Sequence, residues 1–434
     1  MTPRVMFVAP SAYPLGGVAN WLDYMVPGLR AAGWGARLAL VAGDVHDAPS
    51  YLREHPDPAA ITVHNPTGSH EGRVRALAAA IERERPAIVC SVNIPDTCAA
   101  AARVRRDLGI PVKAVMTIHG IQPDLFDDLR TFAQVLDGVV CTNRLASALA
   151  AEVAGPGRTH YAPYGVDLPA AVHRHAAGTR LRIAVAGRIE EWQKRGSDLR
   201  PIADALAQSG VDFELLIAGA GPDEPHLRAA LAPHAARVKF LGTVPAAEMA
   251  ARVYGHSDVL LLTSLWETGP LVVWEAMAHG LAVVSSRYVG AGREGALVDG
   301  VNCLLFGIGD VRQAAACLEQ LQSPALRHRL AEAGRQLVAA RYTKPLSIQA
   351  WDDCLRKVLA APPAEDSAGP VAAPPAGRLD RWVGTGPAET LRRLTGRRFR
   401  HTQAGGEWPH TLAATDMHDT AFWSHATRVD KEAA

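Results

Sequence analysis

Residues 258–280 read DVLLLTSLWETGPLVVWEAMAHG. The first part, DVLLLTS, is a short and continuously apolar run, which predicts a β-strand buried on both faces. The loop LWETG follows it, and Pro270 suits the first turn of a helix that Gly280 would end. A strand, a loop and a helix in this order form the repeating unit of a parallel α/β sheet.

The same unit recurs along both halves of the chain. Stretches with helical spacing, such as EGRVRALAAAIERER, separate the short apolar runs. The runs are 5–10, 37–43, 87–93, 112–119 and 138–143, followed by 182–187, 213–219, 238–242, 258–264 and 282–286. This alternation favours an α/β protein with two doubly wound, Rossmann-like parallel-sheet domains. Because ligands of such sheets bind outside the carboxyl ends of the strands, we expect the two domains to face a cleft.

The series of strands stops at DLPAAVHRHAAGTR, which contains Pro and Gly and no apolar run. We place a domain boundary there, and a Pro/Ala-rich stretch further on is typical of a linker. The expected parts are a first domain at 1–170, a second at 180–342, a helix at 343–361 that crosses back to the first domain, a linker at 362–377 and an extension of unknown role at 378–434.

Composition limits the classes of protein to consider. The chain has 434 residues, of which 48% are hydrophobic and 21% charged, as is usual for globular proteins. A formal net charge of +1 gives no overall field that would attract nucleic acid, so we expect no such partner. The six cysteines form no C-x-x-C pair, which favours buried free thiols in a reducing compartment. No run reaches the roughly 18 apolar residues of a membrane span and the first apolar stretch is too short for a signal peptide, so we expect a cytoplasmic protein.

Two glutamates lie on either side of the expected helix start. Glu267 is in the loop, and Glu275 is inside the apolar helix. A helix N-terminus binds anions through its N–H groups, here those of Gly269, Leu271 and Val272. A carboxylate beside bound phosphate suits ribose or sugar hydroxyls, which offer two donors to one carboxylate. The alternative is that both glutamates are solvated, which the apolar neighbours of Glu275 make unfavourable.

Cations and glycines follow two other strands of the second domain. Arg188 and Lys194, in GRIEEWQKRG, come directly after a strand and suit a diphosphate, although such a pair alone is more often solvated. Gly219 and Gly221, in IAGAGPD, allow a backbone to approach a ligand closely. They fit a plain strand-to-helix turn equally well.

The first domain has weaker signals. In SAYPLGGVANWL, Gly16 and Gly17 precede a helix, where they allow close approach to a phosphate or form a simple turn. In TIHG, His119 ends a strand. A single histidine in that position is more often structural than catalytic.

Several motifs occur together in one order. They are R-I-x4-K-R-G, G-A-G-P, F-L-G, S-x-x-E-x-x-P-x4-E-A-M-A-x-G and V-G-x-G-x-E-x-x-L-V-x-G-x-N, and G-G-V, T-I-H-G and Y-G-V-D precede them. Over residues 4–360 the chain therefore resembles the family-4 retaining glycosyltransferases of the GT-B fold. The E-x7-E segment with its E-A-M-A-x-G tail is the most specific part of this resemblance.

The resemblance implies that a sugar passes, with retention of configuration, from a nucleoside diphosphate sugar to a glycan, lipid-linked or small-molecule acceptor. It places the acceptor on the first domain and the donor on the second, and it favours UDP over GDP on family frequency. The chain has no D-x-D motif, so we expect no metal site and no cofactor. The residues assigned to donor binding are Gly16, Gly17, Arg188, Lys194, Gly219, Gly221, Thr268, Gly269, Pro270, Leu271 and Glu275. Those assigned to catalysis are His119, Glu267, Arg188 and Lys194.

Other functions remain open at this point. One is a non-catalytic partner subunit that binds nucleotide sugars, although such a protein would be expected to lose a cation or a glutamate of the site. Another is a GT-B enzyme of a different class, such as a phosphorylase or an epimerase. A dinucleotide oxidoreductase ranks last, because the first strand-to-helix turn is not G-x-G-x-x-G.

The extension contains the basic run LRRLTGRRFRH, residues 391–401. It could lie on an anionic membrane, as a peripheral contact at the inner face. The run is short and Gly396 interrupts it, so a solvated or partly disordered tail is the favoured interpretation.

Overall fold

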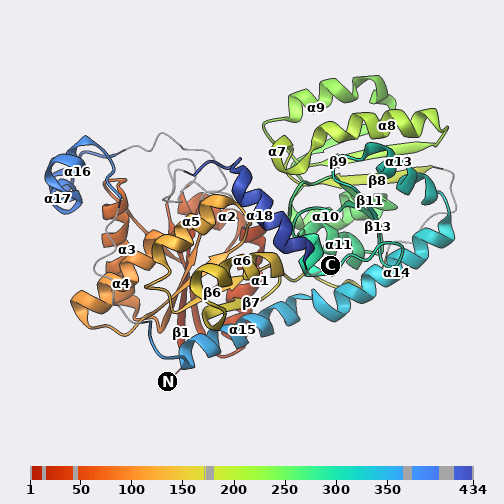
Figure 1. The fold of residues 1–434 in the computed structure, drawn as a ribbon. Helices are drawn as coiled ribbons and strands as arrows, with labels where there is room; N and C mark the ends of the chain where they lie inside the picture. The colour runs from red at the N-terminus through yellow and green to blue at the C-terminus, as the bar shows by residue number, and fades with distance from the viewer. Residues whose placement is uncertain are drawn as a thin grey trace. The chain divides into compact units, whose positions relative to one another are not determined.

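The computed structural model describes residues 2–11, 16–42, 47–170, 172, 180–364, 374–399 and 415–432. The chain forms two compact units, each of which contains one sheet (Figure 1). Unit 1 comprises Met1–Ala162 and Ile348–Trp423, and unit 2 comprises Pro163–Ser347 and Ser424–Ala434. Residues 400–414, which include the end of the basic run, lie outside the described part of the chain.

Unit 1 contains a seven-stranded parallel sheet in the order β3-β2-β1-β4-β5-β6-β7. Its strands are β1 (Arg4–Pro10), β2 (Gly35–Val41), β3 (Ile61–Val63), β4 (Ile88–Val92), β5 (Lys113–Ile118), β6 (Gly138–Cys141) and β7 (Thr159–Tyr161). The order grows outward from β1 in both directions, so the sheet is doubly wound. The sequence did not predict β3 and β7, because three residues at a sheet edge do not form a recognisable apolar run.

Unit 2 contains a six-stranded parallel sheet in the order β10-β9-β8-β11-β12-β13. Its strands are β8 (Leu181–Ala186), β9 (Phe213–Ala218), β10 (Val238–Gly242), β11 (Val259–Leu262), β12 (Ala282–Ser286) and β13 (Leu304–Phe306). Every residue of the central strand β11 is buried, as its apolar run predicted. The two sheets confirm the predicted pair of doubly wound domains, although β13 is again a short strand that the sequence did not reveal.

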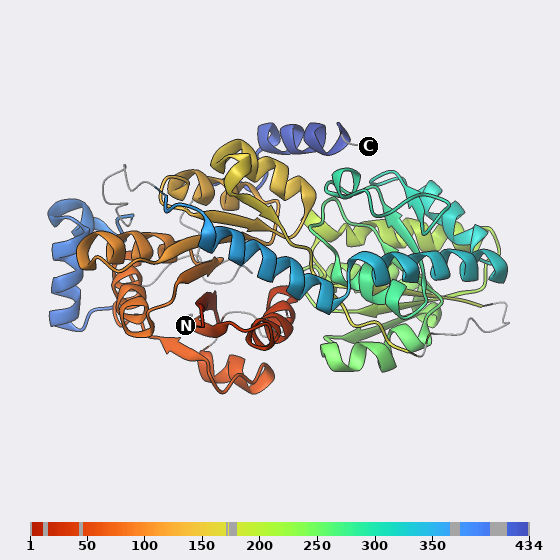
Figure 2. The same cartoon turned by 90° about the horizontal axis from the view of Figure 1, so that it is seen from below.

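Helices cover the faces of both sheets (Figure 2). Those of unit 1 include α1 (Gly17–Ala31), α2 (Ala48–Glu54), α3 (His70–Glu84), α4 (Asp96–Leu108), α5 (Pro123–Phe132), α6 (Arg144–Ala154), α16 (Arg378–Val383) and α17 (Thr385–Thr395). Those of unit 2 include α7 (Glu191–Lys194), α8 (Leu199–Gln208), α9 (Glu224–Leu231), α10 (Ala246–Arg252), α11 (Leu271–Ala278), α12 (Ala291–Glu294), α13 (Val311–Gln320) and α14 (Pro324–Arg341). The remaining two, α15 (Lys344–Ala360) and α18 (Thr420–Lys431), each begin in one unit and end in the other.

The greater part of α15 belongs to the core of unit 1. The Trp351 ring lies 4.9 Å from that of Trp21 and 6.1 Å from that of Phe7, measured between ring centroids. All three side chains are completely buried. Burial of each contributes about 1.5–3 kcal/mol to stability, so α15 is an integral element of this unit. Figure 2 shows it lying between α1 and the strands on the β6 side.

The helix α11 connects the sheet of unit 2 to α14. Trp274 of α11 stacks on Tyr342, with ring centroids 4.2 Å apart, and a Cβ on Gly334 of α14 would lie 2.9 Å from Met277. Pro270 is the N-cap of α11, one residue before the first turn in which the sequence placed it. Its carbonyl accepts hydrogen bonds from the amides of Val273 and Trp274, so it still closes the first turn of the helix.

All six cysteines are buried and free, as their sequence contexts predicted. Burial raises the pKa of Cys98 and Cys141 to about 12, so both thiols stay protonated at neutral pH. Among the described residues, no helix is both long and apolar enough to cross a membrane.

The C-terminal extension is ordered where the structure describes it. α16 and α17 form a helical hairpin on α3 (Figure 1). In α18, the Phe422 ring packs against Phe126 of unit 1, whereas Asp430 accepts hydrogen bonds from the amides of Gly290, Gly292 and Arg293 in unit 2. The described helices of the extension therefore bury side chains that have specific partners, while most described residues of the basic run are exposed to solvent.

Candidate functional site

The loops after β8 and β9 meet at the carboxyl edge of the sheet in unit 2. The amide of Gly187 donates to Ala218 O at 3.0 Å, and the amide of Ile189 donates to Ala220 O at 3.0 Å. These bonds continue the pairing of the strands beyond their ends. They hold the residues that follow β8 in a fixed position above the sheet edge.

This close approach of two backbones requires glycine at positions 219 and 221. A Cβ on Gly219 would lie 1.8 Å from Gly187 O, and one on Gly221 would lie 2.1 Å from Ile189 O. Gly219 also has a φ of +143°, which side-chain-bearing residues rarely adopt. The neighbouring loop is therefore sufficient to explain both glycines, and their contact with a donor stays a prediction.

A pocket lies beside these loops, and Gly187, Arg188, Lys194, Thr263 and Ser264 contribute to its lining. Most of its residues come from the ends of β8, β9 and β11 and the loops that follow them, and α7, α8 and α9 contribute Lys194, Leu199 and Leu227. In doubly wound sheets the carboxyl ends of the strands are the usual place for a ligand. The structure thus brings both predicted cations to the edge of one pocket.

Lys194 forms an ion pair with one of the two predicted glutamates. Its Nζ donates to Glu267 Oε1 at 2.5 Å, and Ser264 Oγ donates to the same oxygen at 2.6 Å. The carbonyl of Lys194 accepts from Thr263 Oγ1 at 2.7 Å. Lys194 remains one-fifth exposed, whereas Glu267 is buried. The cation therefore lies at the boundary between a buried carboxylate and the pocket.

Arg188 has polar partners both on α7 and at the residue that precedes α7. Its guanidinium pairs with Glu190 Oε2 at 3.0 Å and donates to Gln193 Oε1 at 3.0 Å. Gln193 is buried and donates from Nε2 to Trp266 O at 3.3 Å. The sequence analysis missed Glu190 and Gln193, because nothing in GRIEEWQKRG distinguishes a bridging side chain from a solvated one.

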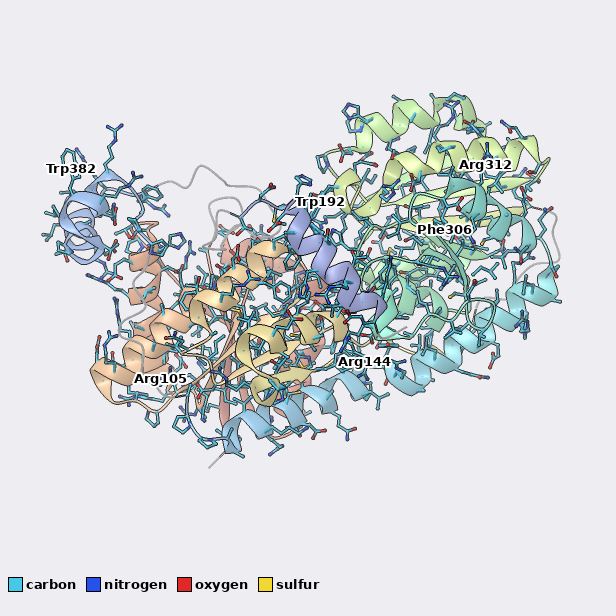
Figure 3. All side chains as sticks on the ribbon, viewed as in Figure 1. Arg105, Arg144, Trp192, Phe306, Arg312 and Trp382 are labelled. Atoms are coloured by element: carbon cyan, nitrogen blue, oxygen red, sulfur yellow. The ribbon has the colours of Figure 1, made fainter. Side chains whose placement is uncertain are left out.

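The loop that carries Glu267 has little conformational freedom. Its backbone bonds to Gln193 O through the amide of Leu265, and to Val289 O through the amide of Glu267. Trp266, packed on Trp192 with ring centroids 5.2 Å apart, fills the space beneath the loop (Trp192 is labelled in Figure 3). A carboxylate on such a loop keeps its place without a ligand, which favours preorganised binding.

The residues that follow Glu267 lead directly into α11. Thr268 is buried, Gly269 is half-buried, and Pro270 caps the helix whose first residue is Leu271. The backbone N–H groups of Thr268, Gly269 and Leu271 lie at this helix start, which attracts negative charge, whereas Pro270 has no N–H to donate. Four predicted donor-binding residues, 268–271, follow Glu267 directly in the chain. Their sequence positions therefore bring them close to the ion pair of Glu267 with Lys194.

Glu275, the second glutamate, has a different set of partners. Tyr254 Oη donates to its Oε2 at 2.5 Å. Burial raises the pKa of Glu275, the hydrogen bond from Tyr254 and the charge of Lys344 oppose that rise, and Asp167 adds to it. Lys344 and Asp167 form their own ion pair at 2.6 Å. Tyr254 and Lys344 are further residues that the sequence analysis missed, since they lie far from the E-x7-E motif and in no motif of their own.

In unit 1, Gly16 is the N-cap of α1 and Gly17 is its first residue. Trp21, one turn further along α1, packs on His119, with ring centroids 4.7 Å apart. His119 follows β5 and is buried, and this burial lowers its pKa to about 3. The imidazole is therefore neutral at physiological pH, so it can exchange hydrogen bonds with a substrate but cannot supply a positive charge.

No group of three or more His, Cys, Asp or Glu that could hold a metal ion occurs among the residues that the structure describes. The predicted donor site comprises Arg188 and Lys194 as cations, a helix start and two carboxylates. The carboxylates accept hydrogen bonds and the cations neutralise phosphate charge.

Comparison with known proteins places this pocket in a recognised domain. Residues 180–323 match the family described as Glycosyl transferases group 1. The chain is 32% identical over 173 residues to a GDP-mannose-dependent alpha-(1-6)-phosphatidylinositol dimannoside mannosyltransferase of Mycobacterium tuberculosis. That match covers 37% of this chain and 44% of the relative, so less than half of the relative's length is represented.

Solved glycosyltransferase structures share the fold. Sucrose-phosphate synthase from Thermosynechococcus elongatus is 19% identical with a TM-score of 0.68, and the match covers 83% of this chain and all of the other. HepE of Anabaena, in complex with UDP and glucose, is 17% identical with a TM-score of 0.65 and coverages of 82% and 99%. The lipopolysaccharide outer core galactosyltransferase WaaB is 16% identical with a TM-score of 0.64 and coverages of 81% and 99%. The predicted GT-B fold and the resemblance to family-4 glycosyltransferases are thereby confirmed.

Proposed function

We propose that this chain is a retaining glycosyltransferase that transfers a sugar from a nucleoside diphosphate sugar to a hydroxyl group of an acceptor. One observation carries this proposal. Lys194, already paired with the buried Glu267, lines a pocket together with Arg188 inside the segment that matches a glycosyltransferase family. A diphosphate is the leaving group that such a pair of cations would stabilise.

In this proposal Arg188 and Lys194 hold the diphosphate and neutralise the charge that develops on it as the glycosidic bond breaks. Removal of one such group in other enzymes slows the reaction by about 10²–10³-fold, which sets the scale expected here. Glu267 accepts hydrogen bonds from donor-sugar hydroxyls, and its ion pair positions Lys194. Glu275 accepts hydrogen bonds from the ribose, and the neutral His119 bonds to the donor sugar.

The donor nucleotide is the part of the proposal that the comparisons change. UDP was the first expectation from the sequence, with GDP second. The sequence relative is named for GDP-mannose, whereas the structures that contain UDP are under 20% identical and support only the fold. We therefore place a GDP-sugar first and a UDP-sugar second.

The acceptor and the metal requirement are also proposals. The sequence relative is named for a phosphatidylinositol dimannoside, which supports a glycan on a lipid as the acceptor class here. Arg188 and Lys194 provide the positive charge that a divalent cation would otherwise supply, so we propose transfer without metal.

A thermal-shift experiment with the full chain tests donor binding. GDP, UDP, ADP, dTDP and CMP are added separately, first without metal and then with magnesium. A ligand that binds only the folded protein raises the melting temperature, so one diphosphate is expected to give a shift that magnesium does not change. The absence of a shift with every diphosphate would contradict the proposal.

Product analysis then separates transfer from the alternatives. Incubation of the matching nucleotide sugar with lipid extract or simple glycosides is expected to release the nucleoside diphosphate and give an α-linked product from an α-linked donor. An epimerase would change the sugar without releasing the nucleotide, and a phosphorylase would require inorganic phosphate. A non-catalytic subunit would bind the donor and release no nucleotide.

A further inference from the structure

The α16–α17 hairpin has an unusual distribution of polarity. The side of α17 that faces the protein carries Glu389 and Arg392, and both side chains are buried. The side that faces solvent carries Leu391 and Leu394, three residues apart and hence on one face of the helix. Amphipathic helices of water-soluble domains normally have the opposite arrangement, with leucine inside and charge outside. The outer face of α17 is therefore more apolar than is usual for a helix face that contacts only water.

Specific contacts hold the hairpin in this orientation. Glu389 is completely buried and accepts hydrogen bonds from Ser69 Oγ at 2.6 Å and Thr67 Oγ1 at 2.9 Å. Arg392 forms a two-pronged ion pair with Asp380 of α16, which ties the two helices together. These buried polar contacts allow only one face of the hairpin to dock on unit 1. The leucines are consequently fixed on the outside.

The exposed apolar side chains of the hairpin are extreme for this protein. Trp382 is 84% exposed and Leu394 is 79% exposed, the two highest fractions among the exposed large hydrophobic side chains of the described residues. Val383 and Leu391 are each 44% exposed on the same hairpin. In Figure 3, Trp382 lies on the side of the hairpin away from α3. Isolated exposed leucines are common, whereas a group of this kind on one small element indicates a binding surface.

The charge of the same surface has one sign. Within residues 374–399 the acidic side chains are Asp380 and Glu389, and both are buried in the contacts described above. The exposed charged residues of this segment are Arg378, Arg381, Arg393, Arg397 and Arg398, of which Arg393 also pairs with Glu389 at 3.1 Å. The chain as a whole has a net charge of only +1, so this positive surface is local.

We propose that the α16–α17 hairpin docks on the surface of an anionic lipid bilayer, with Trp382 and Leu394 in the interfacial layer and the arginines against lipid headgroups. Tryptophan is enriched at membrane–water interfaces, and basic side chains beside it add electrostatic attraction to anionic lipids. The inference does not depend on the proposed donor or on catalysis.

Vesicle flotation with the full chain tests the proposal. The probes are vesicles of phosphatidylcholine alone and vesicles of phosphatidylcholine mixed with phosphatidylglycerol. The protein is expected to float with the anionic vesicles and to be released by salt, because exposed charges are screened. Exchange of both arginines of α16 in an R378Q/R381Q variant is expected to weaken this binding about fivefold or more for each arginine removed.

Matched variants separate the apolar contribution of the hairpin to vesicle binding from nonspecific adsorption of the protein. Trp382→Ser combined with Leu394→Ser is expected to weaken binding at least about tenfold, since both side chains leave water on docking. Leu108→Ser and Val301→Ser, at positions 49% and 53% exposed elsewhere on the chain, are expected to leave binding unchanged. Melting temperatures of all these variants should match that of the parent, because the replaced side chains are exposed.

Three results would overturn the proposal. They are no flotation with anionic vesicles, equal flotation with neutral and anionic vesicles, and a W382S/L394S variant that binds as well as the parent. The parent protein could instead fail to bind vesicles and form a complex with another protein, and the W382S/L394S variant fail to form that complex. The surface would then be a protein-docking site, and the lipid assignment would be wrong.

Discussion

The pocket of unit 2 and the α16–α17 hairpin of unit 1 both bury a glutamate, and the two glutamates are bound in different ways. Glu267 pairs with a lysine that is still partly exposed and lines a pocket. Glu389 is completely covered, and hydroxyl groups and Arg393 are its partners. Burial and pairing of a carboxylate therefore do not identify a functional site by themselves. The difference lies in the partner, since a cation with one side open to a pocket can bind a second anion.

Asp430 extends the comparison to a carboxylate bound by backbone amides. It accepts hydrogen bonds from the amides of Gly290, Gly292 and Arg293 at the start of α12 and anchors the end of α18. A ligand carboxylate or phosphate could be bound by amides in the same manner, but here the protein supplies the anion itself. We therefore interpret Glu389 and Asp430 as structural anchors and propose that Glu267 binds substrate. Glu275 is bound by Tyr254, so its contact with the donor ribose is a separate proposal.

Replacement of Lys194 should have the largest effect. We expect Lys194→Ala to reduce the transfer rate by about 10²–10³-fold, because the leaving diphosphate loses a cation. The variant should remain folded but melt at a lower temperature, because the buried Glu267 loses the cation that compensates its charge. Initial rates of nucleotide release, measured at saturating donor, provide the test.

Lys239→Ala is the matched control for that variant. Lys239 also forms a lysine–glutamate pair at 2.5 Å in unit 2, with Glu214, but it is two-thirds exposed and does not line the pocket. Its replacement should leave the rate unchanged. Equal losses of activity in both variants would mean that the assignment of Lys194 is wrong.

Replacement of Glu389 should affect structure and leave donor binding intact. Glu389→Ala leaves Thr67 and Ser69 without their acceptor and is expected to destabilise the docked hairpin by about 1–3 kcal/mol. Hydrogen exchange of the α17 amides should accelerate accordingly. Glu82→Ala, at an exposed position of α3, is the control and should not change exchange. A loss of donor affinity in Glu389→Ala would remove the distinction between the two kinds of carboxylate.

Asp430→Ala should have a smaller and local effect. Loss of a carboxylate that caps backbone amides costs about 0.5–2 kcal/mol. Hydrogen exchange at Gly290, Gly292 and Arg293 should accelerate, whereas it should not in Glu432→Ala, which removes an exposed glutamate of the same helix end. Unchanged exchange at these three amides would contradict the anchoring role.

The smallest predicted effect is a pH dependence of donor affinity that originates from Glu275. Its raised pKa means that the free folded protein retains this proton to a higher pH than the unfolded chain does. This group therefore favours the folded state at low pH, and that contribution is lost as pH rises through the raised pKa. Ribose hydroxyls bind the ionised form better, so donor affinity should fall by a few-fold, about 1 kcal/mol, as pH decreases through the same range.

Calorimetric titration with an intact nucleotide sugar measures this effect without interference, because its diphosphate has no terminal proton that titrates near neutral pH. In the parent, the dissociation constant should rise as the pH is lowered through the raised pKa of Glu275. Glu275→Gln should bind more weakly at neutral pH and show no such dependence. A parent protein whose affinity is independent of pH would contradict the ribose assignment.

Much of the fold could be predicted from the sequence because parallel strands buried on both faces leave a clear signal. β11 and the loop and helix that follow it were all predicted from one 23-residue stretch. The three-residue edge strands β3, β7 and β13 could not be predicted, since edge pairing depends on the neighbouring strand more than on the residues themselves. The hairpin of α16 and α17 was missed for a related reason, because apart from Ala388 its buried residues, Asp380, Glu389 and Arg392, are charged.

The sequence by itself determined the two-sheet architecture, the E-x7-E spacing around the start of α11 and the positions of the cations after β8. Only the tertiary structure decided which groups meet. It pairs Lys194 with Glu267 and leaves Glu275 to Tyr254, and it gives Glu389 partners more than 300 residues away in the chain. Strand periodicity is a local property that short segments encode, whereas a side-chain contact between distant residues depends on the order of strands in the sheet and on how the helices pack. For that reason the candidate residues of the site were visible in the sequence, and their ion pairs and the outward-facing surface of the hairpin were not.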